Sequence, residues 1–208
     1  MLSKSSIIII DYYMGNLRSI LNKINRIGYN AVVTNNADII KKADKIILPG
    51  VGHFQKAMEN LKQLQLLEVL NEAVIIKKIP ILGICLGMQL MAKFSEEGDV
   101  NGLGWFDADV VRFRVSDHLK YKVPHIGWNN AIAEKDSPLF KGKSAEAMYY
   151  FVHSYHMRCN LKEDILANTE YDYTFTSAVQ KNNIFGTQFH PEKSHDDGEK
   201  LLRNFVEL

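Results

Sequence analysis

IPILGICLG, residues 79–87, is the stretch that decides the fold. Its first part, Ile79 to Ile84, predicts a strand that is buried on both faces, as in a parallel sheet. Its second part, Gly83 to Gly87, has the form of a nucleophile elbow, in which a tight turn leads from a strand into a helix. The flanking glycines relieve crowding in such a turn. We therefore expect Cys85 to be lifted above the sheet at the start of a helix.

The chain on both sides of this elbow alternates between strand and helix patterns. A buried strand is expected at 7–10, and short strands are expected at 31–33 and 45–48. An amphipathic helix is expected at 17–27, and further helices are expected at 57–64 and 66–76. After Gly104 most segments are strand-like, at 105–113, 149–153, 175–179 and 184–189, and a short helix around 201–206 ends the chain. This pattern predicts an α/β fold, namely a doubly wound, mostly parallel sheet with a mixed or antiparallel C-terminal half. With no linker or repeat, we expect a single domain over residues 1–208.

Composition excludes several functional classes. The chain has 25 Lys and Arg against 24 Asp and Glu, a net charge of +1, and no basic run that could follow a phosphate backbone, so nucleic acid is not an expected partner. No unbroken apolar stretch is long enough to span a bilayer, so no membrane association is expected. Two cysteines, Cys85 and Cys159, cannot form a disulfide framework and indicate reduced thiols, hence a cytoplasmic protein.

The elbow has a catalytic and a structural interpretation. At the start of a helix the peptide dipoles would stabilise the thiolate of Cys85, and the backbone amide of Leu86 would point at a reacting carbonyl. Alternatively, Cys85 is a small buried side chain at a glycine-rich bend, as free cysteines often are. The pentapeptide alone leaves both interpretations open.

The stretch GTQFHPE, residues 186–192, supplies a base for a cysteine nucleophile. Pro191 drives His190 toward an extended conformation, in which residues two apart project to the same side. Glu192 could then hold the imidazole tautomer while His190 faces the thiolate. A zinc site built from histidines is a weaker alternative, because no paired cysteines or His-Glu-x-x-His motif accompany them; its ligands would be His153, His156, His190 and His195.

The loop LPGVG, residues 48–52, follows a predicted strand. Its two glycines allow backbone amides to turn toward a ligand, which an oxyanion hole requires. The chain has no G-x-x-x-x-G-K-[ST] motif and no G-x-G-x-x-G after a strand, so a nucleotide site is not expected. Neither a metal nor another cofactor is expected.

With these motifs in this order, the sequence resembles the class I (triad) glutamine amidotransferases over nearly its whole length. Within them it is most similar to the HisH-like glutaminase subunits of imidazole glycerol phosphate synthases. The resemblance rests on residues 15–17, 48–52, 83–90, 95–98, 124–129, 150–155 and 186–194. The last three blocks distinguish HisH-like proteins from other triad glutaminases.

The resemblance implies a role for each matching residue. Cys85 would attack the side-chain amide of L-glutamine, His190 would protonate the leaving ammonia, and Glu192 would orient His190. The oxyanion amides would come from Gly52 and Leu86; the residues holding glutamine would be Gln89, Glu97, Ser154 and Tyr155; and those facing the partner would be Trp128, Tyr150 and Lys193. The ammonia would be consumed on another polypeptide, a HisF-like (β/α)8 cyclase, in a heterodimer serving histidine biosynthesis.

Some residues depart from the family pattern. The turn after the first strand usually reads Asp-Tyr-Gly, whereas here it reads Asp11-Tyr12-Tyr13, so a differently shaped loop is expected if that position needs positive φ. His53 replaces a small residue. His156 and His195 resemble a branch that supplies ammonia for amidino groups on surface sugars, so the acceptor stays open. Two further alternatives are a free-standing γ-glutamyl peptidase, disfavoured by the block at 124–129, and a regulatory protein without catalytic activity, disfavoured by the intact triad.

Overall fold

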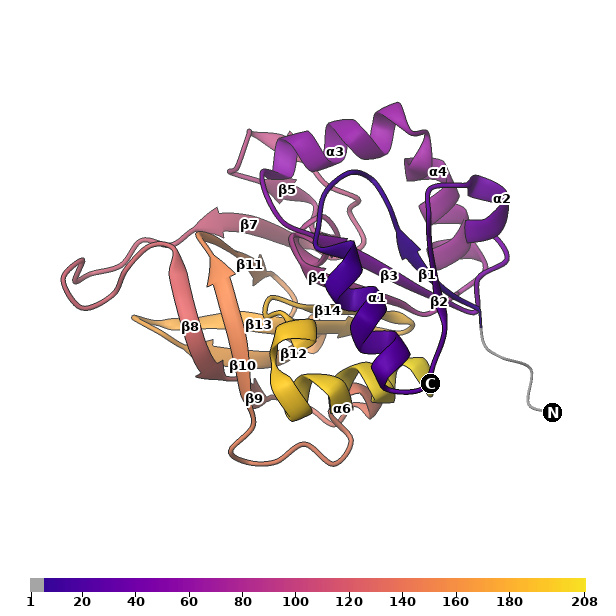
Figure 1. Cartoon of the computed structure of the whole chain (residues 1–208). Coiled ribbons are helices and arrows are strands. Elements are labelled where there is room, and N and C mark those ends of the chain that lie inside the picture. The colour runs from indigo at the N-terminus through magenta and orange to yellow at the C-terminus, as the bar shows by residue number, and fades with distance from the viewer. Residues whose placement is uncertain (1–5) are drawn as a thin grey trace.

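The computed structural model describes residues 6–208 and has a central twisted sheet with helices on both faces (Figure 1). One half of the sheet is parallel, with spatial order β2-β1-β3-β4-β14. These strands are β1 (Ile7–Ile10), β2 (Ala31–Thr34), β3 (Lys45–Gly50), β4 (Ile81–Cys85) and β14 (Ile184–Thr187). The order requires crossover helices, which pack back onto the two faces of the sheet.

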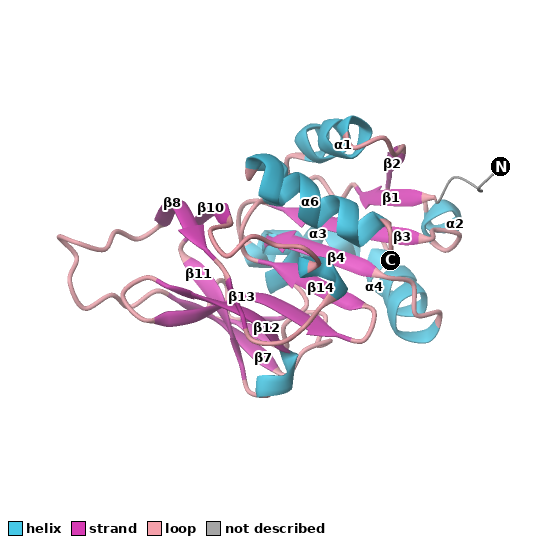
Figure 2. Cartoon of the chain, turned by 90° about the horizontal axis from the view of Figure 1, so that it is seen from below, coloured by secondary structure: helices cyan, strands magenta, loops and turns pink. Residues whose placement is uncertain are grey.

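The helices divide between the two faces of the parallel half (Figures 1 and 2). One face carries α1 (Leu17–Arg26) and α6 (His195–Val206), and the other carries α2 (Ala37–Ile40), α3 (Phe54–Gln63) and α4 (Leu66–Asn71), which continues into the π-helical turn η1 (Glu72–Ile76). Alternate residues of β1 enter the two cores: Ile7 and Ile9 pack with α1 and α6, Ile8 and Ile10 with the opposite layer. This double burial explains the unbroken apolar run.

The second half of the sheet is largely antiparallel. From β14 it continues through β13 (Thr174–Lys181), β11 (Tyr155–Cys159), β7 (Ala108–Arg112), β5 (Phe94–Ser95) and β6 (Val100–Asn101), with β12 (Ile165–Glu170) and β9 (Ile132–Ala133) pairing beside β13. Two further strands, β8 (His125–Asn130) and β10 (Met148–His153), form a separate antiparallel ribbon. The short helices are α5 (Leu86–Gln89), η2 (Pro138–Phe140), η3 (Lys162–Asp164) and η4 (Pro191–Lys193). The predicted fold class is therefore confirmed.

Several element boundaries differ from the sequence prediction. The helix expected over 66–76 is divided between α4 and η1, α3 begins at Phe54 rather than at Ala57, and α6 has 12 residues where a short helix was expected. The single-turn helix α2 was not predicted; it forms because the Asn36 side chain accepts hydrogen bonds from the Asp38 and Ile39 amides. The ribbon strand β8 was identified only as a motif.

The loop after β1 has a non-glycine residue, Tyr13, in the left-handed conformation. Tyr13 has φ 66° and its side chain is 68% exposed. Tyr13 therefore adopts the left-handed conformation itself, at a cost of about 1 kcal/mol or more. Its amide donates to Asp11 Oδ1 at 3.1 Å.

Strand register brings three chain segments together at one edge of the sheet. Gly50 of β3 lies opposite Cys85 of β4, and Thr187 of β14 lies opposite Ile84. All three strands end at this edge because they are parallel. The loop after β3, the turn after β4 and the segment after β14 therefore meet where parallel α/β sheets place their ligand sites.

Candidate active site

Cys85 ends β4 in a conformation that few non-glycine residues adopt. Its backbone has φ 54° and ψ −111°, and such strain persists only where the surrounding packing fixes it. The packing is tight here, because a Cβ on Gly87 would lie 1.8 Å from the carbonyl oxygen of Leu48. Only glycine lets the turn approach β3 so closely. The elbow thus holds the thiol at the carboxyl edge of the sheet.

The helix that follows Cys85 is much shorter than the elbow motif suggested. α5 contains only four residues, and the loop at 102–106 binds the carbonyls beyond it, with the Leu103 amide donating to Leu90 O at 2.7 Å. A macrodipole is a sum over aligned peptides, so one turn contributes little beyond its own free amides. Stabilisation of a thiolate must therefore come mainly from side chains around the sulfur.

His190 and Glu192 form a buried pair beside the elbow. Nδ1 of His190 lies 2.8 Å from Oε1 of Glu192. His190 is extended, with φ −98° and ψ 94°, but Glu192 lies in the 3₁₀ turn η4 rather than in the extended segment that the sequence predicted. The two side chains meet because the turn that begins at Pro191 folds the carboxylate back under the ring. The contact holds Nδ1 as the donor and leaves Nε2 for chemistry.

The environment of His190 favours the charged imidazolium. Burial alone would lower the pKa of His190, but its interactions with Cys85 and with the Glu192 carboxylate raise it to about 10. Nε2 is buried and has no hydrogen-bond partner among the described residues. The geometry thus provides a buried proton donor whose charge is balanced on both sides, which suits a thiolate–imidazolium pair.

A cavity of about 410 Å³ opens next to Cys85. Its walls include all the residues that the sequence assigned to the oxyanion hole and to substrate binding, which are Gly52, Leu86, Gln89, Glu97, Ser154 and Tyr155. Pro124, Val152 and His153 complete one side. A concave site of this size, with a few polar groups beside a nucleophile, suits one small polar substrate.

Gln89 and Glu97 are already hydrogen-bonded within the protein. The side-chain nitrogen of Gln89 donates to Tyr155 O at 2.9 Å and to Gln188 Oε1 at 3.0 Å, which leaves its Oε1 as the group that can accept from a ligand. Glu97 accepts from the Phe54 amide at 2.8 Å and so ties the start of α3 to the cavity wall. His53, which precedes that helix, is exposed and makes no side-chain cap.

Tyr12 holds the loop after β3 by a hydrogen bond. The sequence did not indicate this residue. The Tyr12 hydroxyl is fully buried and donates to Pro49 O at 2.6 Å. Burial, with the nearby Cys85, raises the pKa of Tyr12 well above its usual value, so the hydroxyl stays a donor. Gly52, two residues beyond Gly50, has φ 113°, which favours glycine. The orientation of the candidate oxyanion loop therefore depends on a tyrosine in the preceding β1 loop.

Gln188 is the second residue that sequence reasoning missed. It is fully buried, and its side-chain nitrogen lies 3.6 Å from the Cys85 sulfur. The only signal was its place in the 186–192 stretch, two residues before His190, where alternation puts both side chains on one side of an extended chain.

Trp128, Tyr150 and Lys193 lie outside the cavity, on the outer side of the β8–β10 ribbon. Trp128 pairs opposite Tyr150, is 43% exposed, and stacks on His195 with the rings 5° from parallel. Lys193 Nζ lies 5.6 Å from the centre of the Tyr150 ring. The His190 amide donates to Tyr150 O at 2.9 Å, so the ribbon is hydrogen-bonded directly to the segment that carries the base.

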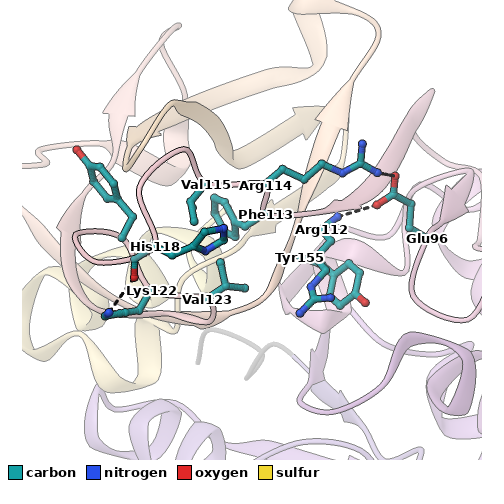
Figure 3. Close-up of a pocket in the computed structure, with 10 residues that line it drawn as sticks. Glu96, Arg112, Phe113, Arg114, Val115, His118, Lys122, Val123 and Tyr155 are labelled. Atoms are coloured by element: carbon teal, nitrogen blue, oxygen red, sulfur yellow. Dashed lines mark hydrogen bonds and ion pairs between the residues drawn. The ribbon is translucent and has the colours of Figure 1, made fainter.

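A larger cavity of about 880 Å³ lies beside the first and shares Tyr155 with it (Figure 3). Its lining is cationic, with Arg112, Arg114 and Lys122 exposed toward solvent. Glu96 neutralises part of this charge, because its carboxylate binds the Arg114 guanidinium at 3.1 Å. None of its lining residues is a cysteine or serine, whereas Cys85 lines the smaller cavity.

Comparison with known proteins identifies the family. The family described as "Glutamine amidotransferase class-I" matches residues 8–208. The chain belongs to the class I glutamine amidotransferases. A HisH 2 subunit of imidazole glycerol phosphate synthase from Methanococcus maripaludis is 50% identical over 96% of this chain and 98% of its own length. HisH 2 from Pseudomonas aeruginosa is 46% identical, over 97% of this chain and 99% of its own length.

Solved structures agree on the fold of this amidotransferase. A crystal structure described as a glutamine amidotransferase has a TM-score of 0.73 at 18% identity and covers 96% of this chain and 97% of its own. PurLQS from Thermotoga maritima has a TM-score of 0.73 at 14% identity, over 98% of each chain. None of the helices in the described part of the chain combines the length and apolar character that a membrane span requires.

Three other histidines of the amidotransferase, His125, His153 and His156, lie in an aromatic cluster around Phe113. No group of three or more potential metal ligands comes together within residues 6–208. His153 Nδ1 lies 2.8 Å from Tyr155 O, so it carries the hydrogen, and His153 Nε2 accepts from His125 Nδ1 at 3.1 Å. Because Nε2 of His153 accepts in this arrangement, the His153 ring is neutral, in agreement with its burial.

The histidine cluster predicts a loss of stability in mild acid. Burial lowers the pKa of His125 and of His156 from 6.5 to about 4, and lowers that of His153 well below 6.5. Between these values the unfolded chain binds more protons than the folded one, so unfolding becomes easier as pH falls below 6.5. Each histidine removes up to about 1.4 kcal/mol per pH unit. Urea unfolding from pH 8 to pH 5 measures this slope.

Two substitutions separate this effect from ordinary acid titration. His156→Gln should reduce the slope between pH 6.5 and 5, because one titrating group is removed, whereas His118→Gln, at an exposed position, should leave it unchanged. Equal stability at pH 7.5 and 5.5 in the parent chain would contradict the prediction.

Proposed function

We propose that this amidotransferase is the glutaminase subunit of an imidazole glycerol phosphate synthase and acts in histidine biosynthesis. The observation that carries the proposal is the buried pair of His190 and Glu192, with Nδ1 of His190 2.8 Å from Oε1 of Glu192, next to Cys85, which lines the smaller cavity. The HisH relatives, matched over nearly their whole length, supply the pathway. We further propose that residues 1–208 act as one domain and work in the cytoplasm, where Cys85 and Cys159 stay reduced.

The reaction we propose uses each group of the site once per half-reaction. The Cys85 thiolate attacks the side-chain carbonyl carbon of glutamine, and the backbone amides of Gly52 and Leu86 bind the resulting oxyanion. The His190 imidazolium gives its proton to the departing amine, which leaves as ammonia, and a γ-glutamyl thioester remains on Cys85. His190, now neutral, takes a proton from the attacking water. The thioester breaks to L-glutamate, and the thiolate and imidazolium are restored.

Substrate selection follows from the polar groups that the protein leaves free. Oε1 of Gln89 can accept a hydrogen bond, Glu97 offers a carboxylate for an α-ammonium group, and the backbone at Ser154 and Tyr155 lines the opposite wall. These groups match the two ends of free glutamine.

We propose that the partner is a HisF-like (β/α)8 synthase that binds the outer face of the β8–β10 ribbon. Ile126 and Trp128 are 59% and 43% exposed there, next to Tyr150 and Lys193, and aromatic anchors of this kind are typical of interface centres. Because Tyr150 O binds the His190 amide, a partner on this face would act directly on the base. This contact supports control of the glutaminase by the loaded synthase.

Steady-state glutamine hydrolysis with and without the synthase and its acceptor tests this function. The isolated chain should be nearly inactive, and the acceptor-loaded partner should raise kcat by about 10²–10³, the value of one oxyanion donor brought into place. Trp128→Ala and Lys193→Ala should lose the stimulation with unchanged basal rate, whereas Lys62→Ala, on the exposed side of α3, should keep it. High activity that does not depend on the partner would favour a free-standing glutaminase or peptidase.

A further inference from the structure

Gln188 contacts the candidate nucleophile Cys85 and precedes the candidate base His190 by two residues. Its backbone amide donates to Ser177 O at 2.8 Å, which anchors the segment after β14 to β13. Its side chain is fully buried, with Nε2 at 3.6 Å from Cys85 Sγ. A fully buried amide that reaches the sulfur of a cysteine is a candidate for more than packing.

The Tyr155 carbonyl determines which atoms donate and which accept in the hydrogen bonds of Gln89 and Gln188. Tyr155 O is a carbonyl and can only accept, so the side-chain atom of Gln89 that lies 2.9 Å away must be its nitrogen. The same nitrogen lies 3.0 Å from Gln188, so Gln188 must present its oxygen to Gln89. The amide of Gln188 then has only its nitrogen left to face Cys85 Sγ.

A contact of His153 supports this assignment of hydrogen-bond donors and acceptors. Its Nδ1 donates to the same Tyr155 carbonyl at 2.8 Å. Two hydrogen bonds therefore hold the Tyr155 carbonyl in this orientation. The chain of contacts therefore runs from His153 through Tyr155 O and Gln89 to Gln188. The side chains of His153, Gln89 and Gln188 are buried, which limits the competition of water for these bonds.

We propose that Gln188 is a further catalytic residue, which donates a side-chain hydrogen bond to the Cys85 thiolate. The proposal rests on the proposed function, because it requires Cys85 to be the nucleophile. A donor aimed at sulfur favours the thiolate over the thiol, and hydrogen bonds to charged acceptors are the strong ones. It also stabilises the negative charge when the thioester breaks and sulfur leaves. Gln188 transfers no proton itself, so the steps written above keep their balance.

The Gln188 donor supplies stabilisation of the thiolate that the short helix after the elbow does not provide. α5 is a single turn and supplies little dipole, and His190 approaches the sulfur from the segment beyond Phe189. Gln188 offers a neutral donor that does not change with pH. Gln188 does not line the substrate cavity, but its oxygen holds Gln89, which does. The thiolate fraction is therefore best measured with a small alkylating probe that does not depend on glutamine binding.

The test is the pH profile of Cys85 alkylation by iodoacetamide, read by mass spectrometry, in the parent chain and in Gln188→Met. Methionine keeps the length of the side chain but cannot donate. The pH of half-maximal alkylation should rise by about 1 unit, the equivalent of a tenfold change, as expected for loss of one hydrogen bond to a charged group. The acidic limb of the kcat/KM profile should move by the same amount, with the plateau kcat within about threefold of the parent.

Matched controls keep the proposal falsifiable. Gln180→Met, in β13 and lining a different cavity, should change neither profile. If Gln188→Met does not fold, as judged by its melting curve, Gln188→Glu replaces the donor by a carboxylate of the same size and should raise the midpoint further. A folded variant with an unchanged midpoint would overturn the proposal.

The same experiment separates this proposal from the proposed function. Alkylation by a glutamine-analogue electrophile at Cys159 rather than Cys85 would overturn the assignment of the nucleophile itself. Labelling at Cys85 with an unmoved pH profile in Gln188→Met would leave the nucleophile in place and reduce Gln188 to a packing residue.

Discussion

Cys85→Ala will reduce glutamine hydrolysis to background while the chain keeps its fold. Alanine retains the Cβ that packs in the elbow and meets the same backbone requirement, φ 54°, as the cysteine does, so the turn should form. It cannot form a thioester, and the two-step route through a covalent intermediate is lost. We expect a loss of at least about 10⁴-fold in kcat, by analogy with removal of the nucleophile in other triads. Ammonia release measured with glutamine and the acceptor-loaded synthase gives this value.

Cys159 provides the matched control for this substitution. It lies in β11, and burial, followed by the nearby Asp164, raises the pKa of its thiol to about 12, so it is a poor nucleophile at neutral pH. Cys159→Ala should therefore keep full activity, and a glutamine-analogue electrophile should label the parent at Cys85 alone. Residual turnover well above background in Cys85→Ala would show that another group begins the reaction.

The parallel half of the fold could be predicted because its signals are local. The run Ile7–Ile10 is buried on both faces, and the spacing of Ile20 and Ile24 places one face of α1 against it, so period and burial agree. Gly28 follows the end of α1 with φ 92°, as a helix-terminating glycine does. In these segments no tertiary contact overrides the pattern.

The antiparallel half was predicted only in outline, because its strands depend on long-range pairing. β8 contains Gly127 at φ 142° and has only one face covered, so its pattern resembles a loop until β10 pairs with it. β5, β6 and β9 have two residues each and carry no periodic signal. These three strands form because they pair with neighbouring strands, not because of their local propensity.

The candidate active site could likewise be predicted only in part. The elbow and the pairing of His190 with Glu192 follow from residues that are adjacent or two apart, so the sequence pattern could bring them together. Tyr12 and Gln188 were missed because their contacts, to Pro49 O and to the Cys85 sulfur, span 37 and 103 residues. Only the strand order β1-β3-β4-β14 places those residues side by side.

Substitutions in the His190–Glu192 pair should have unequal effects. His190→Asn removes both the proton donor for ammonia and the base for water, and should lower kcat by about 10³–10⁴-fold, at the upper end of general acid–base catalysis. Glu192→Gln keeps an oxygen that accepts from Nδ1 but loses the charge, so we expect a loss of only about 10–10², the worth of one charge-assisted hydrogen bond. Single-turnover glutamine hydrolysis, with melting curves for both variants, measures the two effects.

The pH profile of Glu192→Gln provides an independent check on the role of the carboxylate. In the parent chain the Glu192 charge contributes to raising the pKa of His190 to about 10, so its removal should lower that pKa. The imidazolium then loses its proton at lower pH, and the alkaline limb of the kcat profile should move toward neutrality. The acidic limb belongs to thiolate formation and should respond to Gln188→Met instead. Equal losses of rate in His190→Asn and Glu192→Gln, or an alkaline limb that does not move, would mean that Glu192 does something other than orient and charge-stabilise the imidazolium.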